Sequence, residues 1–194
     1  QPHSSSFITH PSSLIPIPNS LSSENACFLP NMETAVNLIQ DGAPIIGERV
    51  LVLGQGVVGL LTAALLNEFP LDKLTIVDNF ELRRNAIQVE GSKVKNLAPT
   101  NLRHSTLDSF DLVFELTGSP SALNTAIEHT AFSGRIVIGS WYGKKTAEIN
   151  LGGAFHRSRI RLWSSTRGAQ TVYQVPAGCH FASPSDGETN TRAF

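Results

Sequence analysis

The chain has 194 residues, of which 41% are hydrophobic and 16% are charged, so it can form one domain of about 150 residues with a remainder. Its formal net charge of −1 argues against non-specific binding to nucleic acids or acidic membranes. Two cysteines exclude a disulfide-dense scaffold and a four-thiolate zinc site built from this chain alone, and no apolar run approaches the roughly 18 residues of a membrane span.

The amino-terminal part predicts a surface segment followed by a helix. Residues 1–23 are rich in Ser and Pro, and proline fixes φ and removes a backbone donor, so we expect this segment at a surface or edge. A transit peptide is disfavoured because no arginine precedes Arg49, whereas such peptides are rich in arginine. Residues 31–40 predict a helix that Asn31 caps and Gly42 ends.

From Arg49 onward, short apolar runs alternate with helical patterns. Continuous apolar runs of this length suit strands buried on both faces of a parallel sheet. The expected strands are residues 50–53, 74–77, 112–116 and 135–138, an edge strand over 160–163, and a short strand near Leu102. Helices are expected over residues 60–66 and after Ser119, which caps, and Pro120, which occupies the first turn. This alternation predicts an α/β fold with a doubly wound parallel sheet and right-handed crossovers.

We place this domain at residues 41–166. Residues 167–194 show no sustained apolar period and are rich in Ser, Thr, Gly and Pro, so we expect a disordered tail. The chain begins at Gln1 and its only methionine is Met32, from which we expect a fragment or a processed chain.

One glycine-rich motif carries the chemistry. Gly54, Gly56 and Gly59 form G-x-G-x-x-G directly after an apolar strand and before an apolar helix, and Asp78 ends the next strand. The first glycine permits a tight turn, the second leaves room for a pyrophosphate, and the third lets helix and strand pack closely. The motif therefore predicts a dinucleotide site of the Rossmann type, rather than a glycine turn of an unrelated α/β domain.

The start of the helix after the motif is expected to hold the phosphates. The backbone N–H groups around Val57 and Val58 lie in its first turn, where they have no partner within the helix, and the helix dipole favours negative charge there. Asp78 can accept hydrogen bonds from both ribose hydroxyls of an adenosine, and its charge repels a 2′-phosphate, which favours NAD over NADP. Arg83 and Arg84 could weaken that preference by pairing with a phosphate, although a solvated helix face explains them as well.

Small residues follow two further strands at their carboxyl ends. Thr117 and Gly118 follow one of them, and Gly139 and Ser140 follow the other. Ligands of open α/β sheets lie outside these ends, where small residues let a cofactor approach the backbone. Ordinary turn chemistry explains the same residues equally well.

These features resemble the medium-chain dehydrogenase/reductase family, the zinc-type alcohol and sorbitol dehydrogenases. The similarity covers about Phe7 to Trp163, and its marks include the Leu14–Pro18 segment, the Gly47–Gly59 segment, the Phe114–Ser119 segment and the Ser133–Val137 segment. The segments Leu29–Ala35 and Gly139–Gly143 look most like the bacteriochlorophyllide dehydrogenase-like branch of that family.

The resemblance implies a two-domain enzyme in which a GroES-like catalytic domain precedes the cofactor domain. Residues 1–40 then correspond to the end of a truncated GroES-like β domain and a linking helix. Thr34 matches a family position near the nicotinamide. Thr117, Gly118 and Gly139 match loops that contact the cofactor.

The zinc chemistry of the family finds no ligand set in this chain. The first two ligands of the catalytic zinc would lie before residue 1, and the third falls on Pro30, which offers no ligand atom. Cys27 resembles a small buried hydrophobe, and Glu33 serves equally well as a carboxylate near a helix start. His3 and His10 lie in a Ser/Pro segment, where solvation is the simplest explanation. We therefore assign no metal ligand and leave zinc open, since a catalytic site needs three protein ligands.

The sequence and the resemblance predict an oxidoreductase fragment whose parent transfers a hydride between NAD(P) and an alcohol or carbonyl compound. The alternative is a module that binds NAD(H) without turnover, and no catalytic residue is assigned. The expected partners are a nicotinamide dinucleotide and a small alcohol or carbonyl substrate, with no nucleic acid or membrane. A homo-oligomer is compatible with the resemblance. We expect a soluble intracellular protein, cytoplasmic unless it is directed to an organelle.

Overall fold

The computed structural model describes residues 16–86, 94–103 and 109–165. The chain divides into two compact units, of which the larger spans Phe28–Thr166 and contains the sheet. The smaller unit contributes the short helix α1 (Ser23–Ala26), whose cap Ser22 accepts a hydrogen bond from the backbone N of Asn25. The predicted tail over residues 167–194 and the first 15 residues lie outside the described residues.

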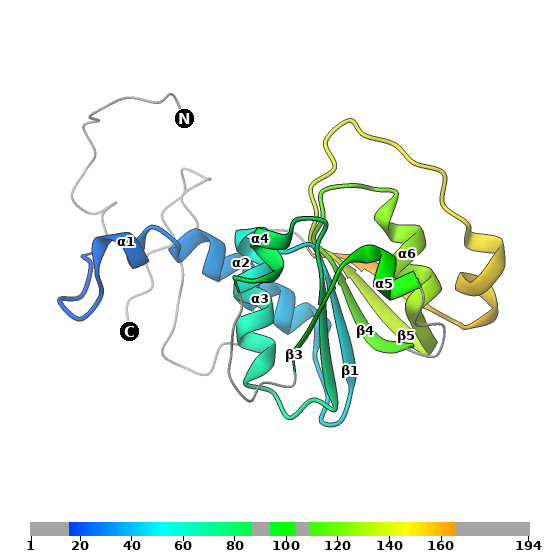
Figure 1. The fold of residues 1–194 in the computed structure, drawn as a ribbon, viewed down its shortest axis with the longest axis horizontal. Coiled ribbons are helices and arrows are strands. Elements are labelled where there is room, and N and C mark those ends of the chain that lie inside the picture. The colour runs from blue at the N-terminus through cyan, green and yellow to red at the C-terminus, as the bar shows by residue number, and fades with distance from the viewer. Residues whose placement is uncertain (1–15, 87–93, 104–108, 166–194) are drawn as a thin grey trace, which may run out of the picture. The chain divides into compact units, whose positions relative to one another are not determined.

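Six parallel strands form one sheet in the described part of the chain, in the order β3-β2-β1-β4-β5-β6. The strands are β1 (Arg49–Leu53), β2 (Lys73–Val77), β3 (Val94–Leu97), β4 (Phe110–Glu115), β5 (Thr130–Ile138) and β6 (Arg161–Ser164). β1 lies between β2 and β4, and the chain winds outward from it in both directions (Figure 1). This topology confirms the predicted doubly wound α/β fold.

Two layers of helices cover the sheet because its strands are apolar on both faces. Alternate residues of β1 separate into two cores, with Val50 and Val52 in one and Leu51 and Leu53 in the other. The first core packs against α2 (Leu29–Gly42) and α3 (Val57–Asn67), and the second packs against α5 (Pro99–Arg103) and α6 (Ala122–His129). Figure 1 shows these two pairs of helices on opposite sides of the strands.

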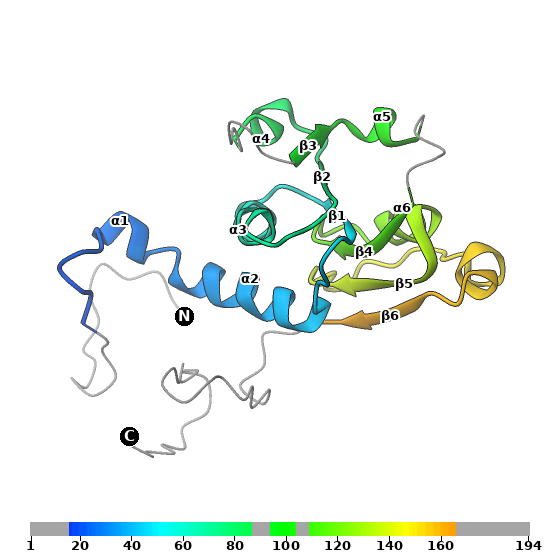
Figure 2. The same cartoon turned by 90° about the horizontal axis from the view of Figure 1, so that it is seen from below.

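The helix α2 runs antiparallel to the strands. Arg135, in β5, donates from Nε to the carbonyl oxygen of Gly42 at 2.7 Å, at the carboxyl end of α2. Leu38, one turn earlier, lies where a Cβ on Gly139 would be, beyond the carboxyl end of β5. Residues of α2 that precede Leu38 therefore extend past the carboxyl edge of the sheet, and Figure 2 shows α2 extending away from the strands.

Most predicted strands and helices are confirmed, and three local assignments were wrong. The strand expected near Leu102 is β3 at residues 94–97, and Leu102 is instead a buried residue of α5. The first helix begins earlier than Asn31, because Pro30 fits its first turn. The helix ends at Gly42, as expected, and its C-cap is Ala43, in the left-handed region at φ 42°.

The start of α6 also differs from its expected position. Ser121 is the N-cap, two residues after Ser119. The edge position of β6 is confirmed, since it pairs only with β5 among the described strands. Two short segments complete the fold, α4 (Glu81–Arg84) and a helical turn over Leu151–Phe155. No helix in the described ranges is both long and apolar enough to cross a membrane.

Candidate functional site

The loops that follow four neighbouring strands meet at the carboxyl edge of the sheet. Backbone hydrogen bonds tie them together: Gly54 N donates to Val77 O at 2.8 Å, and Leu116 N donates to Leu53 O at 2.8 Å. The order of the strands reverses between β1 and β4, which is where ligands of such sheets bind. Seven of the predicted site residues lie in these loops, namely Gly54, Gly56, Asp78, Thr117, Gly118, Gly139 and Ser140.

The three motif glycines differ in what surrounds them. Gly54 has φ +96°, and a Cβ there would lie 2.6 Å from the carbonyl oxygen of Leu116. A Cβ on Gly59 would lie 2.0 Å from the carbonyl oxygen of Gly54, so helix and loop approach too closely for any side chain. A Cβ on Gly56 would meet no atom within 4 Å. Two of the glycines therefore serve the packing, and Gly56 borders open space.

The amino end of α3 faces this open space without a side-chain cap. Its N-cap is Gly56, which makes no side-chain hydrogen bond, so the first N–H groups of the helix, which include those of Val57 and Val58, have no partner within it. Val57 is half exposed, whereas Val58 packs against the core. Free N–H groups, the positive end of the helix dipole and open space together fit a phosphate group.

Asp78 lies directly beside the glycine loop. Its side chain is 6% exposed, and its two oxygens accept hydrogen bonds from the backbone N of Gln55 at 2.7 Å and of Phe80 at 2.8 Å. An ionised carboxylate offers about four lone-pair positions, so these two bonds fix its orientation and leave acceptor capacity for the hydroxyls of a ribose.

Both arginines after Asp78 are held by neighbouring groups. Arg83 lies 3.7 Å from the Asp78 carboxylate and 4.7 Å above the Phe80 ring. Arg84 donates from Nη1 to the carbonyl oxygens of Asp78 and Asn79, at 2.8 and 2.9 Å. Arg84 is thereby directed at backbone, and Arg83 partly offsets the charge of Asp78.

The end of β4 carries a charged residue that the strand pattern concealed. Glu115 is fully buried, and its Oε1 accepts hydrogen bonds from the backbone N of Thr117, at 2.8 Å, and from the Thr117 hydroxyl. Its Oε2 accepts the hydroxyl of Tyr142. Burial, followed by this hydrogen bond and the charge of Glu115, raises the pKa of the Tyr142 phenol well above its ordinary value.

We expect this pKa shift to be visible in a spectrophotometric titration. A Tyr142→Phe variant should lose a tyrosine ionisation that the wild-type chain shows only well above pH 10.0. Because the folded pKa is raised, the stability that the pair contributes is fully present below the unfolded pKa and is lost only as pH rises beyond it. If the spectrum of the wild type minus that of Tyr142→Phe showed a tyrosine ionisation with a midpoint near pH 10, it would contradict the buried pairing.

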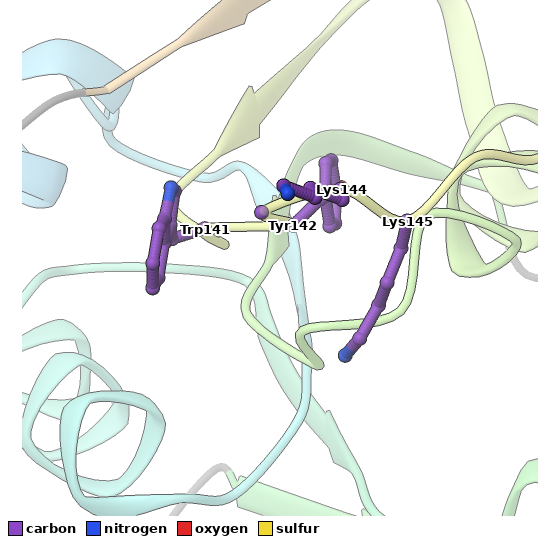
Figure 3. A pocket seen from close by; sticks show the side chains of 5 residues that line it. Trp141, Tyr142, Lys144 and Lys145 are labelled. Carbon is purple, nitrogen blue, oxygen red and sulfur yellow. The ribbon is translucent and has the colours of Figure 1, made fainter.

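A second set of hydrogen bonds ties the loop after β4 to the loop after β5. Gly118, at φ +71°, donates from its backbone N to Ser140 Oγ at 2.9 Å, and its carbonyl oxygen accepts from Lys145 Nζ at 2.8 Å. Residues Trp141 to Lys145 line a cavity of about 500 Å³ at this position, and the Trp141 and Lys145 side chains project from opposite ends of the segment (Figure 3).

Thr34 lies on α2, one turn before Leu38 and therefore beyond the carboxyl edge of the sheet. Its hydroxyl donates to the carbonyl oxygen of Pro30 at 3.0 Å. Thr34 thus extends past the same edge of the sheet as the loops described above, and its predicted contact with a nicotinamide stays a prediction.

Potential metal ligands do not gather in the described residues. No group of three or more His, Cys, Asp or Glu side chains among residues 16–86, 94–103 and 109–165 is arranged to hold a metal ion. Cys27, expected as a buried hydrophobe, is exposed, and this expectation was wrong. His3 and His10 lie outside the described residues.

Two residues of this edge were absent from the predicted site, Glu115 and Tyr142. The available signal was a charged residue at the end of an otherwise apolar strand, directly before Thr117 and Gly118. Such a residue must find partners when the strand is buried, but the identity of its partner 27 residues away is set by the fold.

Comparisons with known proteins were made for the chain and for its structure. L-threonine 3-dehydrogenase of Xanthomonas campestris pv. campestris strain B100 is 27% identical over 132 residues, which cover 66% of this chain and 38% of that enzyme. A short chain alcohol dehydrogenase of Escherichia coli CFT073 complexed with NADH superposes with a TM-score of 0.66 at 18% identity, over 79% of this chain and 47% of that one.

A structure described as a candidate zinc-binding dehydrogenase of Sinorhizobium meliloti 1021, bound to NADP, also has a TM-score of 0.66, at 19% identity over 77% of this chain and 46% of that one. No protein-family model matches the chain. These findings confirm the resemblance to the medium-chain dehydrogenases. The chain spans about two fifths of the length of the curated relatives, and the narrower resemblance to the bacteriochlorophyllide branch stays a prediction.

Proposed function

We propose that this chain supplies the dinucleotide-holding part of a nicotinamide-dependent oxidoreductase of the medium-chain type. The whole protein would transfer a hydride between NAD(P) and an alcohol or carbonyl substrate. The arrangement at the end of β1 and β2 carries this proposal: open space at Gly56, an uncapped helix start and the oriented carboxylate of Asp78. These three features match a phosphate pair joined to an adenosine ribose.

The nicotinamide ring would supply the hydride chemistry, and the residues of this chain would bind and orient it. Asp78 would accept the adenosine ribose hydroxyls, and the N–H groups at the start of α3, around Val57 and Val58, would hold the pyrophosphate. The other half of the dinucleotide would then extend across the ends of β4 and β5, over Gly118, Gly139 and Ser140. Thr34 would approach it from α2. The dehydrogenase name of the relative and the NADH and NADP bound in the similar structures support a nicotinamide cofactor.

NAD is the favoured cofactor. The Asp78 carboxylate is fixed beside the glycine loop, and a 2′-phosphate placed there would meet its charge. Arg83, which the sequence left as a candidate partner of that phosphate, lies instead between Asp78 and the Phe80 ring. The Asp78 charge thus decides the preference, and Arg83 reduces it.

An Asp78→Ala variant is expected to bind NADH about tenfold or more weakly, because two hydrogen bonds to a charged acceptor are lost. NADPH should bind as well as before or better, since Arg83 is released from its carboxylate. Calorimetric titration of each variant with NADH and with NADPH measures the ratio of the two dissociation constants. The matched control is Glu81→Ala, an exposed carboxylate three residues later, which should leave the ratio unchanged.

The test has two clear negative outcomes. A wild-type chain that binds neither NADH nor NADPH would contradict the proposed function. An unchanged NADH affinity in the Asp78→Ala variant would remove Asp78 from the ribose site. Oxidation of an alcohol with NAD⁺ by the isolated chain would exclude the alternative, a binding module without turnover.

A further inference from the structure

Glu115 is a carboxylate residue on β4, a central strand of the parallel sheet. It ends β4, between the Gly54 loop and the Gly139 loop, and no part of its surface is exposed. Burying a carboxylate is costly unless hydrogen bonds satisfy it, so its partners show what the fold gains by keeping it there.

In the part of the chain that the structure describes, the Glu115 side chain takes its hydrogen-bond partners from two loops. The loop after β4 contributes the backbone N and the hydroxyl of Thr117, and the segment after β5 contributes the hydroxyl of Tyr142. The backbone carbonyl oxygen of Glu115 binds the second loop as well, through Gly139 N at 3.0 Å and Ser140 Oγ at 3.2 Å. One residue therefore fixes both loops.

The two loops are also joined to each other through Gly118. The Ser140 hydroxyl accepts a hydrogen bond from the backbone N of Gly118, and Lys145 donates to the carbonyl oxygen of Gly118. Lys145 and Tyr142 line the cavity at Trp141–Lys145 (Figure 3). The loops thus have a defined mutual position before any ligand arrives.

We propose that Glu115 is a positioning residue, which holds the Thr117–Ser119 and Ser140–Tyr142 loops in the conformation that receives the nicotinamide half of a dinucleotide. This inference rests on the proposed function. Asp78 and the start of α3 occupy the adenosine and pyrophosphate positions, so the remaining half has to pass over these two loops. Fixing them in advance lowers the entropy lost on binding.

The inference predicts that substitution of Glu115 weakens the binding of NADH more than the binding of AMP. A Glu115→Gln variant keeps the side-chain shape but loses the charge and one acceptor oxygen. We expect its affinity for NADH to fall about tenfold, while its affinity for AMP, which reaches only the Asp78 side, changes less than about twofold. Tyr142→Phe removes one donor and keeps the ring, so it should weaken NADH binding by a smaller factor in the same direction.

Asp111→Asn is the matched control, because Asp111 is a carboxylate at the opposite end of the same strand. It accepts a hydrogen bond from the backbone N of Arg49 at 2.9 Å and lies 3.5 Å from the Arg49 guanidinium. It should change neither affinity. Calorimetric titrations of the wild type and the three variants with NADH and AMP give six affinity ratios, and a thermal melt of each variant shows whether it is folded.

The outcomes separate the two proposals. A Glu115→Gln or Tyr142→Phe variant that binds NADH like the wild type overturns the positioning role, while the proposed function stands. An equal loss of NADH and AMP affinity also overturns it, because the carboxylate would then support the whole domain. A wild-type chain that binds AMP but not NADH, or neither ligand, refutes the proposed function itself.

Discussion

Replacing Arg135 by methionine is expected to lower the free energy of unfolding by about 3–5 kcal/mol, the cost of breaking a buried ion pair from one side. The guanidinium is 9% exposed and binds both oxygens of Glu48, at 2.5 and 2.7 Å. It also donates to the carbonyl oxygens of Gly42 and Ala43, at 2.7 and 2.8 Å. Its loss leaves the largely buried Glu48 carboxylate without a countercharge, with the backbone N of Ile45 as its remaining donor. It also removes the donors to the Gly42 and Ala43 carbonyl oxygens at the end of α2.

Chemical unfolding followed by circular dichroism measures this loss. Arg49→Met is the matched control, since the Arg49–Asp111 pair is about one third exposed on both sides and should contribute less than about 1 kcal/mol. Adding Glu48→Met to Arg135→Met is expected to recover part of the stability, because the unpaired carboxylate is then removed as well. A loss below about 1 kcal/mol for Arg135→Met would show that the pair does not hold α2 on the sheet.

The second large effect concerns two glycines of the G-x-G-x-x-G motif, Gly59 and Gly56, which should differ in their effects on stability and on cofactor binding. Gly59→Ala places a methyl group 2.0 Å from the carbonyl oxygen of Gly54, so loop and helix must move apart. We expect the free energy of unfolding to fall by about 1–3 kcal/mol, and NADH affinity to fall with it because the displaced helix start holds the pyrophosphate.

Gly56→Ala is the counterpart of that variant. Its added methyl group meets no atom within 4 Å, and its φ of −68° is open to any residue. Unfolding free energy should therefore change by no more than about 1 kcal/mol, the difference between Gly and Ala at an N-cap. NADH affinity should nevertheless fall at least tenfold, since the methyl group fills the space that the pyrophosphate needs. Equal behaviour of the two variants would contradict the separate roles of these glycines.

Much of the sheet could be predicted because its signals are local. The runs Val50–Leu53 and Ile136–Ile138 are apolar without alternation, and Leu74–Val77 is interrupted only by Thr75. Such runs are typical of strands covered on both faces. β3 was misplaced because Val94–Leu97 contains Lys95 and Asn96 and lies at an edge, where no continuous apolar run is required. Leu102 is an apolar residue nearby, but it belongs to α5 and is buried in the core on one face of the sheet.

The site at the carboxyl edge of the sheet also divides into residues that local patterns predict and residues that only the fold brings together. The glycine motif and Asp78 could be predicted because their spacing is itself the signal of a strand, a turn and a helix. Glu115 and Tyr142 could not be paired in advance, because nothing in a strand pattern tells which distant hydroxyl will reach a buried carboxylate. Likewise, Arg83 reads as a free cation in the sequence, and only the fold places it beside Asp78 and Phe80.

The sequence by itself thus determined the parallel sheet, its winding and the positions of the dinucleotide motif, since each follows from local periodicity and from residues with special backbone geometry. The tertiary structure decided which charges are paired: Arg135 with Glu48 across 87 positions, and Glu115 with Tyr142 across 27. The physical reason is that burial makes an unpaired charge costly. The sequence therefore indicates that a partner must exist, while only the packing of the strands and helices selects it.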